Sequence, residues 1–314
     1  MKLLVLGFSN IFQRRVLPVL GECGVERVDI ASESGRPVPD NHPLVGGVFG
    51  EYRQAIRSSG TDAVYISTTN ERHAPLAREA LSAGLHVIVD KPAAMSLGDA
   101  VELAGLAVRN NRCLAEATVF GAHPQIRRAR EIFRENGVRP TRISSTFSIP
   151  PLGDDNFRYR KALGGGAIAD TGVYAVVPGR LFFETAPTAV HARITSRGAE
   201  VETGYSLLMD FGKGRALVGH FGFDTEYRNW IEILGPGLCV RFDRAFTTTP
   251  ELENVLTVIR ANAVSTETAQ AGDSFAIFFG GVIRDIGAGD FRQYAQAMLE
   301  DAQSVDMLRR AARQ

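Results

Sequence analysis

Two short apolar strands joined by a helix constrain the fold of this chain more than any other feature. Residues 63–66 and 86–89 are apolar runs rich in β-branched side chains, and a helical pattern lies between them at residues 72–83. A strand, a crossover helix and a second strand predict a parallel βαβ unit. The second strand leads almost directly into Lys91. Open α/β sheets form their ligand clefts at the carboxyl ends of such strands, so Lys91 is the first candidate for a functional residue.

The pattern along the rest of the chain predicts two domains. Up to about residue 118, strand and helix signals alternate, which is typical of a doubly wound parallel sheet. From residue 141 onwards, strands come in longer alternating runs, some separated by glycine-rich turns that predict antiparallel hairpins. We therefore expect an α/β fold with a Rossmann-like dinucleotide-binding domain over residues 1–120. An α+β domain with an open, mostly antiparallel sheet should follow over residues 121–314.

Composition and charge argue against several classes of protein. The chain has 35 acidic residues and 35 lysines and arginines, so its formal net charge is zero. Nucleic-acid-binding proteins usually carry a basic excess, so we expect no nucleic-acid partner. No apolar stretch approaches the ~18 residues that a membrane span needs, and the first apolar run is too short for a signal peptide. We therefore expect a cytoplasmic protein without a membrane partner.

The three cysteines of the chain do not indicate a special site. Cys23, Cys113 and Cys239 are too few and too scattered for a disulfide framework or a zinc site. The histidines are scattered in the same way, with no spacing typical of metal ligands. We expect no metal.

The turn after the first strand is the expected position of a dinucleotide pyrophosphate. The usual pattern is G-x-G-x-x-G, but this chain has Gly7-Phe8-Ser9-Asn10-Ile11-Phe12, with only the first glycine. An ordinary strand-to-helix turn is therefore an open alternative. Ser9 and Asn10 are small and polar, and either could cap the helix that follows, expected over residues 11–23.

The end of the second strand normally contacts the adenosine ribose of the cofactor. An acid there favours NAD, whereas a small or basic residue accommodates the 2′-phosphate of NADP. Ser32 occupies this position and Arg36 follows closely, whereas Glu33 is a contrary signal. We therefore expect NADP(H), with NAD(H) as the alternative.

Several blocks of sequence, in order along the chain, resemble the glucose–fructose oxidoreductase/inositol dehydrogenase (Gfo/Idh/MocA) family. The first covers residues 65–75 and 84–92, where Thr69 replaces a usual proline and Asp90 replaces a usual glutamate. The second, Glu116-Ala117 followed by His123-Pro124-Gln125, is similar to the branch that contains dihydrodiol dehydrogenases and nucleotide-sugar ketoreductases.

A later block resembles the same family. Its glycine run at residues 164–166 leads into Asp170-Thr171-Gly172-Val173-Tyr174, and Asn156-Phe157-Arg158 precedes it. The resemblance implies an oligomeric enzyme, a homodimer or homotetramer, that binds its cofactor in the first domain. It also implies that the second domain, residues 121–314, serves substrate binding and oligomerisation. The implied cofactor-binding residues are Gly7, Phe8, Ser9, Asn10, Ile11, Ser32, Arg36, Thr68, Thr69, Asn70, His73, Asp90 and Lys91.

Three residues are the catalytic candidates. In the family, the residue matching Lys91 lies beside the nicotinamide, and a lysine there can bind a substrate oxygen or tune a neighbour. Tyr174 matches a position that is often histidine or tyrosine, and a phenol can protonate the alkoxide that hydride transfer creates. Asp170 lies four residues before Tyr174 and can face the same cleft, although helix capping is nearly as good an explanation. Arg158 and His123 are further candidates for the substrate site, with solvated and structural roles as their alternatives.

These observations predict an NAD(P)-dependent oxidoreductase that acts on a carbohydrate carbonyl or alcohol. The preferred substrate is a nucleotide-linked 3-keto-sugar, which the enzyme would reduce. A dehydrogenase of a free sugar, a cyclitol or a trans-dihydrodiol is the alternative enzyme. Because fold does not fix function, a non-catalytic cofactor-binding regulator or scaffold stays open as a different class.

Overall fold

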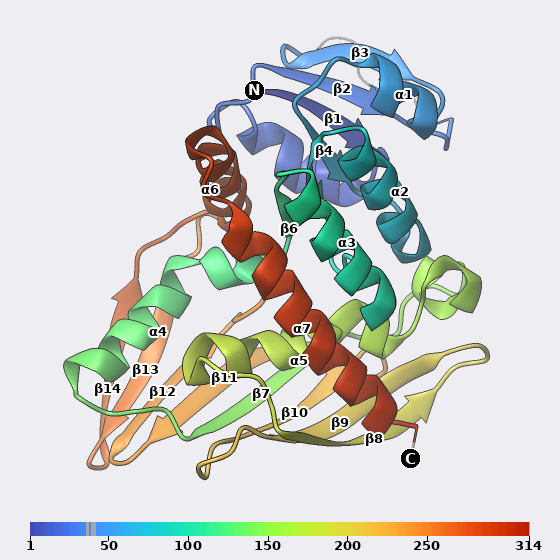
Figure 1. The fold of residues 1–314 in the computed structure, drawn as a ribbon. Coiled ribbons are helices and arrows are strands. Elements are labelled where there is room, and N and C mark those ends of the chain that lie inside the picture. Colours follow the sequence, from blue (N-terminus) through green and yellow to red (C-terminus); the bar gives the residue numbers. More distant parts are fainter. Residues whose placement is uncertain (36–37, 39–41, 314) are drawn as a thin grey trace. The chain divides into compact units, whose positions relative to one another are not determined.

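The computed structural model describes residues 1–35, 38 and 42–313. Arg36, one of the predicted cofactor contacts, therefore lies outside the described residues. The chain forms two compact units, whose elements are labelled in Figure 1. Unit 1 consists of Met1–Thr118 and Phe275–Ala302, and unit 2 consists of Val119–Ser274 and Gln303–Gln314.

Unit 1 contains the predicted parallel sheet, with six strands in the order β3-β2-β1-β4-β5-β6. This is the strand order of a doubly wound dinucleotide-binding sheet. The chain adds strands to one side of β1 and then to the other, so the order switches between β1 and β4, where such sheets bind their ligands. The fold prediction for this part of the chain is confirmed. The strands are β1 (Lys2–Leu6), β2 (Arg27–Ala31), β3 (Val45–Phe49), β4 (Ala63–Ile66), β5 (His86–Val89) and β6 (Leu114–Glu116).

Helices α1 (Tyr52–Ser58), α2 (Asn70–Ser82) and α3 (Leu97–Arg109) connect the strands of this sheet. The helix expected over residues 11–23 is shorter and irregular. It consists of a π-helical turn, Phe12–Val16, and a 3₁₀ turn, Leu17–Val19. Pro18 lies in the second turn, and its missing N–H group prevents a regular helix from continuing through it.

The assignment of everything after residue 120 to the second domain requires a correction. Helix α6 (Ser274–Ala288) and the first half of α7 (Arg292–Ala311) belong to unit 1. Phe279 is fully buried, and its ring centroid lies 5.1 Å from that of Tyr65 on β4. Met298 joins the apolar cluster around the parallel sheet. The chain returns to the first unit because these apolar side chains are buried there.

Unit 2 contains an eight-stranded sheet in the order β14-β13-β12-β11-β7-β10-β9-β8. All its strand pairs are antiparallel except β7 with β10, as expected for a mostly antiparallel sheet. Two of the predicted hairpins are present, with glycine-rich turns at residues 211–214 and 234–237. The strands are β7 (Arg142–Ser148), β8 (Ala189–Arg197), β9 (Glu202–Asp210), β10 (Ala216–Gly222), β11 (Arg228–Gly235), β12 (Leu238–Asp243), β13 (Asn254–Arg260) and β14 (Ala263–Ala269).

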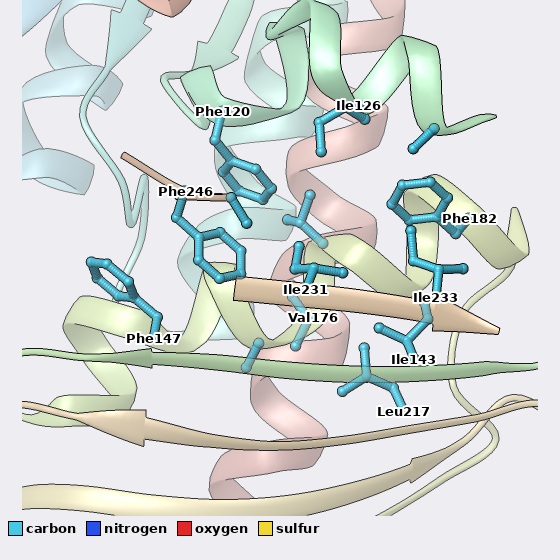
Figure 2. Close-up of a cluster of buried hydrophobic side chains, with 14 of the residues drawn as sticks. Phe120, Ile126, Ile143, Phe147, Val176, Phe182, Leu217, Ile231, Ile233 and Phe246 are labelled. Carbon is cyan, nitrogen blue, oxygen red and sulfur yellow. The ribbon is translucent and has the colours of Figure 1, made fainter. Parts of the chain in front are cut away.

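Helices α4 (Pro124–Glu135) and α5 (Ala167–Phe183) cover one face of this sheet (Figure 1). Figure 2 shows the core between them, where Ile143 and Ile231 of the sheet meet Val176 and Phe182 of α5. Helix α5 begins at Ala167, directly after the glycine run at residues 164–166. The backbone N–H of Ile168 donates to a Glu202 carboxylate oxygen at 3.1 Å, so a residue from β9 caps the helix.

Candidate active site

The turn after β1 is held against the turn after β4. Gly7 has a φ of 99°, and a Cβ atom at this position would lie 2.3 Å from the Ser67 carbonyl oxygen. Only glycine fits both the backbone conformation and this close approach. The Ser9 hydroxyl lies 2.7 Å from the Ser67 hydroxyl and accepts a 3.0 Å hydrogen bond from the backbone N–H of Phe12. Ser9 therefore caps the first helical turn, as one of the two predicted alternatives.

The other predicted residues of this loop differ in exposure. The Phe8 side chain is buried and packs edge-on against Phe12, with ring centroids 6.1 Å apart. Asn10 and Ile11 are exposed. We therefore assign the Phe8 side chain to the core. Only the backbone of Phe8 is left as a predicted cofactor contact.

An ion pair lies at the end of β2, where the sequence predicts the ribose contact. The Arg72 guanidinium donates to a Glu33 carboxylate oxygen at 2.7 Å and lies 4.7 Å from the centre of the Tyr52 ring. The hydrogen bond from Arg72 lowers the pKa of Glu33 below its usual value. Ser32 and Ser34 lie alongside, with their hydroxyl oxygens 2.9 Å apart. Arg72 is a site residue that the sequence analysis missed, because its position depends on how α2 packs.

Asp90 holds the turns after β4 and β5 together. The Tyr65 hydroxyl donates to one of its carboxylate oxygens at 2.7 Å, and the Ser67 hydroxyl donates to the other at 2.6 Å. Burial and the nearby Asp90 charge raise the pKa of Tyr65 well above its usual value. Asp90 is thus engaged with protein hydroxyls. We assign it to positioning the turn rather than to direct cofactor contact.

His73 has a similar role on the other side of the turn. The ring is fully buried, with Nδ1 2.9 Å from the Pro92 carbonyl oxygen and Nε2 3.1 Å from the Thr68 carbonyl oxygen. This ring joins the start of α2 to the residue that follows Lys91. The Thr69 hydroxyl donates to Glu71 at 2.7 Å, and the neighbouring Asn70 is buried. The structure therefore places His73 as a support for the Lys91 turn, not as a ligand contact.

Lys91 follows β5 and is partly exposed. Its charge acts on Glu116 at the end of β6, a residue to which the sequence analysis gave no role. Burial raises the pKa of Glu116 to about 7, and the Asp301 charge adds to this, whereas hydrogen bonds and Lys91 oppose it. A Glu116 carboxylate oxygen accepts a 2.7 Å hydrogen bond from the backbone N–H of Ala93. Lys91 therefore lies near a carboxyl group that changes charge near neutral pH.

In unit 2, α5 presents Asp170 and Tyr174 one turn apart, as predicted. The Arg158 guanidinium donates to an Asp170 carboxylate oxygen at 2.9 Å. Burial lowers the pKa of Arg158, but the charges of Asp170 and Tyr174 outweigh burial and leave it above its usual value. Because Glu202 caps α5 through Ile168, Asp170 is a partner of Arg158 and not the helix cap.

Aromatic rings surround the phenol of Tyr174. The centroids of Phe147, Phe246 and Phe120 lie 4.8, 5.1 and 5.6 Å from the centroid of Tyr174. Tyr174 itself is partly exposed. A phenol fixed among aromatic rings, beside a carboxylate and a guanidinium, has the groups needed for a positioned proton donor.

His123 has a structural role. The ring is buried, and its Nδ1 accepts a 3.2 Å hydrogen bond from the backbone N–H of Gln125, which caps α4. Its Nε2 lies 3.4 Å from the Asn254 amide nitrogen. Burial lowers the pKa of His123 below its usual value. These contacts contradict the predicted substrate contact and favour the structural alternative.

The residues that the structure describes include neither a metal-binding cluster nor a membrane-spanning helix. Within residues 1–35, 38 and 42–313, no three His, Cys, Asp or Glu side chains gather in a way that could hold a metal ion. None of the helices in this described part is long and apolar enough to span a membrane.

The parallel sheet, its turns and the polar cluster on α5 define an oxidoreductase of the dinucleotide-binding type. Residues 1–118 match the family model described as "Oxidoreductase family, NAD-binding Rossmann fold", and residues 126–237 match the "GFO/IDH/MocA C-terminal domain". The chain belongs to the Gfo/Idh/MocA oxidoreductase family, which confirms the resemblance seen in the sequence.

Relatives and solved structures agree with this assignment. A dTDP-3,4-didehydro-2,6-dideoxy-alpha-D-glucose 3-reductase from Saccharopolyspora spinosa is 30% identical over 293 residues, covering 91% of this chain and 87% of the relative. A D-xylose 1-dehydrogenase (NADP(+)) from Haloferax volcanii is 29% identical over 275 residues, covering 86% and 84%. The crystal structure of KijD10, a 3-ketoreductase from Actinomadura kijaniata, in complex with NADP and TDP-benzene is 27% identical. Its TM-score is 0.92, with 99% of this chain and 98% of that chain covered.

Proposed function

We propose that this oxidoreductase uses NADPH to reduce the 3-keto group of a nucleotide-linked sugar. The observation that carries the proposal is the cluster of Tyr174, Asp170 and Arg158 on and beside α5. A phenol next to a cation is suited to protonating a carbonyl oxygen that becomes an alkoxide. Similarity over nearly the whole chain to 3-reductases of dTDP-linked keto-sugars supports this substrate class.

The residues at the ends of β1 and β2 fit a dinucleotide. Gly7 and Ser9 form a tight turn at the switch point of the sheet, and hydroxyl groups of Ser32 and Ser34 lie at the ribose end. When bound, the reduced nicotinamide would supply the hydride. The turn of Thr68 and Thr69, supported by the buried ring of His73, would form the adjoining wall.

In this proposal Tyr174 gives its proton to the substrate oxygen. The positive charge of Arg158 stabilises the phenolate that remains, and Asp170 keeps Arg158 in place. Lys91, which follows β5, is the second proposed catalytic group, and its ammonium group can hydrogen-bond a substrate oxygen.

The cofactor proposal is NADP(H), with NAD(H) as the alternative. Glu33, the signal that favoured NAD, is already paired with Arg72 at 2.7 Å. A paired carboxylate competes less for ribose hydroxyls, and the guanidinium is suited to a phosphate. The KijD10 structure contains NADP, and the Haloferax relative is named as NADP-dependent.

We also propose a homodimer or homotetramer, formed through the open sheet of unit 2. Leu208 on β9 and Val218 on β10 are paired across the sheet and are each 42% exposed. Val255 and Val264 on the far strands are also exposed. Exposed apolar side chains at both ends of one sheet favour burial in an assembly. Equilibrium sedimentation tests this, and a monomer at micromolar concentration would contradict it. A cytoplasmic location stays a prediction.

The substrate proposal is tested by following NADPH oxidation with a dTDP-linked 3-keto-sugar, and NADP+ reduction with free D-xylose or with a cyclitol. Turnover of the nucleotide-linked substrate alone supports the proposal. Turnover of free xylose alone would favour the dehydrogenase alternative, which the Haloferax relative supports. Titration with NADPH and NADH, followed by fluorescence, tests the scaffold alternative, since a scaffold without a cofactor site would bind neither.

A further inference from the structure

A cleft in unit 2 is lined by arginines that the proposed reaction does not use. It lies along α4, the end of α5 and residues 138–140, and has a volume of about 870 Å³. This volume is in the range of small-molecule sites, roughly 300–1,000 Å³. The charged residues that line it are Arg127, Arg130, Arg134, Arg139 and Arg215, with Glu131 and Glu184.

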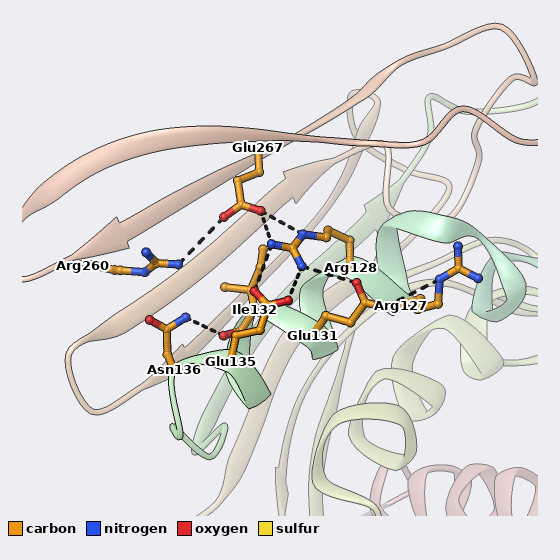
Figure 3. Close-up of polar contacts among 8 residues, drawn as sticks. All are labelled: Arg127, Arg128, Glu131, Ile132, Glu135, Asn136, Arg260 and Glu267. Atoms are coloured by element: carbon orange, nitrogen blue, oxygen red, sulfur yellow. Dashed lines mark hydrogen bonds and ion pairs between the residues drawn. The ribbon is translucent and has the colours of Figure 1, made fainter.

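Helical spacing puts three of these arginines on the cleft side of α4. Arg127, Arg130 and Arg134 are three and four residues apart, so they lie on one face of the helix. Arg128 is absent from the cleft lining and points to the sheet edge, where it binds Glu267 of β14 at 2.6 Å (Figure 3). Arg128 thus belongs to the ion pairs at the sheet edge, whereas the other three arginines of α4 line the cleft.

The carboxylates in the cleft neutralise only part of this charge. Arg130 pairs with Glu184 at 2.6 Å. A Glu131 carboxylate oxygen lies 3.9 Å from a guanidinium nitrogen of Arg127. Glu131 also pairs with Arg128, at 3.4 Å (Figure 3).

The remaining three arginines of the cleft are Arg134, Arg139 and Arg215. None of them has an ion pair within 4.0 Å among the residues that the structure describes. The cleft therefore keeps an excess of about three positive charges, in a chain whose net charge is zero.

One of these cations is fixed in place. The Arg215 guanidinium donates to the carbonyl oxygens of Phe183 and Phe211 at 3.0 and 2.9 Å. A guanidinium held by neutral carbonyls keeps its charge available and loses little freedom when a ligand binds. The floor of the cleft includes Ile126 and Phe182, which belong to the apolar core shown in Figure 2. Low-dielectric walls of this kind strengthen the field of the arginines above them.

We propose that this cleft is a second ligand site, which binds a small molecule carrying a phosphate or diphosphate group. Arginine is suited to such a ligand because its planar fork of N–H donors matches two phosphate oxygens. Arg134 and Arg139 are exposed, line the cleft and lie before and after the chain turn that ends α4. The site shares no residue with the proposed hydride-transfer machinery.

The test is calorimetric titration of the full-length protein with inorganic pyrophosphate at low ionic strength. The double variant Arg134→Ala/Arg139→Ala removes two exposed charges of the cleft. Arg193→Ala/Arg197→Ala is the matched control, because it removes two exposed charges from β8 of the same unit, outside the cleft. Thermal unfolding of each variant checks that it is folded.

The proposal predicts that the cleft variant binds pyrophosphate at least about tenfold more weakly than the native chain, while the control changes by less than about twofold. Added salt should weaken native binding as well. An equal loss in both variants would mean that only the general charge of the unit matters, and would overturn the site. Absence of native binding at millimolar pyrophosphate, or unchanged binding in the cleft variant, would overturn it too.

Discussion

Arg72 on α2 binds Glu33 at the end of β2, with 2.7 Å between the guanidinium nitrogen and the carboxylate oxygen. Glu33 also accepts a 3.3 Å hydrogen bond from the backbone N–H of Tyr52. The acid that favoured NAD in the sequence is therefore held by two donors. The same pair places a cation at the ribose end of the proposed cofactor site.

Replacing Arg72 tests the cofactor choice. Arg72→Ala should weaken NADPH binding by about tenfold or more and leave NADH binding nearly unchanged or improved, because a charged hydrogen bond contributes ~1.5–3 kcal/mol and Glu33 is released. Arg53→Ala is a suitable control, since Arg53 is 79% exposed and pairs with Glu79 at 3.2 Å. Fluorescence titration gives both dissociation constants. Equal weakening of NADPH and NADH binding would mean that Arg72 stabilises the loop and does not select between the cofactors.

Arg36 is the second residue expected to distinguish the two cofactors. Arg36→Ala should weaken NADPH by roughly tenfold and spare NADH, because a guanidinium can pair with the 2′-phosphate. The same titration measures this. If neither dissociation constant changes, Arg36 does not contribute to cofactor binding and Arg72 alone supports the cofactor proposal.

Gly7 should tolerate no side chain. In Gly7→Ala the new Cβ would lie 2.3 Å from the Ser67 carbonyl oxygen, so the two turns must separate. We expect a loss of unfolding free energy of about 2–4 kcal/mol, together with weaker cofactor binding. Gly60→Ala is the matched control, because Gly60 also has a positive φ, of 64°, but nothing within 4 Å of the added atom. A similar loss in both variants, measured by urea unfolding, would show that the backbone conformation alone is responsible.

Glu116 should make stability depend on pH. Its pKa is raised from 4.5 to about 7, so between these pH values the folded protein keeps a proton that the unfolded chain releases. The stability contribution is fully present below about pH 4.5 and is lost as pH rises through about 7.

Comparison with Glu116→Gln isolates this contribution. The variant should gain stability relative to the native chain as pH rises from 5 to 8, by an amount of order 1–3 kcal/mol. Glu22→Gln, at an exposed glutamate of the same unit, should show no such trend. Urea unfolding at several pH values measures both. A difference between native and Glu116→Gln that stays constant with pH would refute a raised pKa for Glu116.

The parallel sheet could be predicted because its inner strands are buried on both faces and therefore consist of continuous apolar runs, such as residues 63–66. The hairpin of β13 and β14 was missed, since β14 is mostly exposed and polar and gives no apolar alternation. Helix α6 was also missed, although it is rich in apolar residues. Its many apolar residues show no clear helical period, and only the fold reveals that Phe279 packs against Tyr65.

The site was predictable where the chemistry follows from local spacing. Asp170 and Tyr174 share a face because they are four residues apart on one helix. Arg72 and Glu116 could not be found in this way. The partner of Arg72 is 39 residues away in the sequence, and the pKa of Glu116 depends on burial that only the fold creates. Asp90 and His73 were identified, but their contacts with protein groups give them positioning roles.

Tyr174→Phe tests the central claim most directly. The change removes the proton donor but keeps the ring among Phe120, Phe147 and Phe246, so folding and NADPH binding should be retained. Turnover of a dTDP-linked 3-keto-sugar with NADPH should fall by a factor of about 10²–10⁴, the usual contribution of a general acid. Lys91→Ala should also lower turnover by orders of magnitude. Tyr159→Phe serves as a control, because the Tyr159 hydroxyl interacts with the backbone at Leu152. Near-native turnover in Tyr174→Phe would contradict the proposed mechanism.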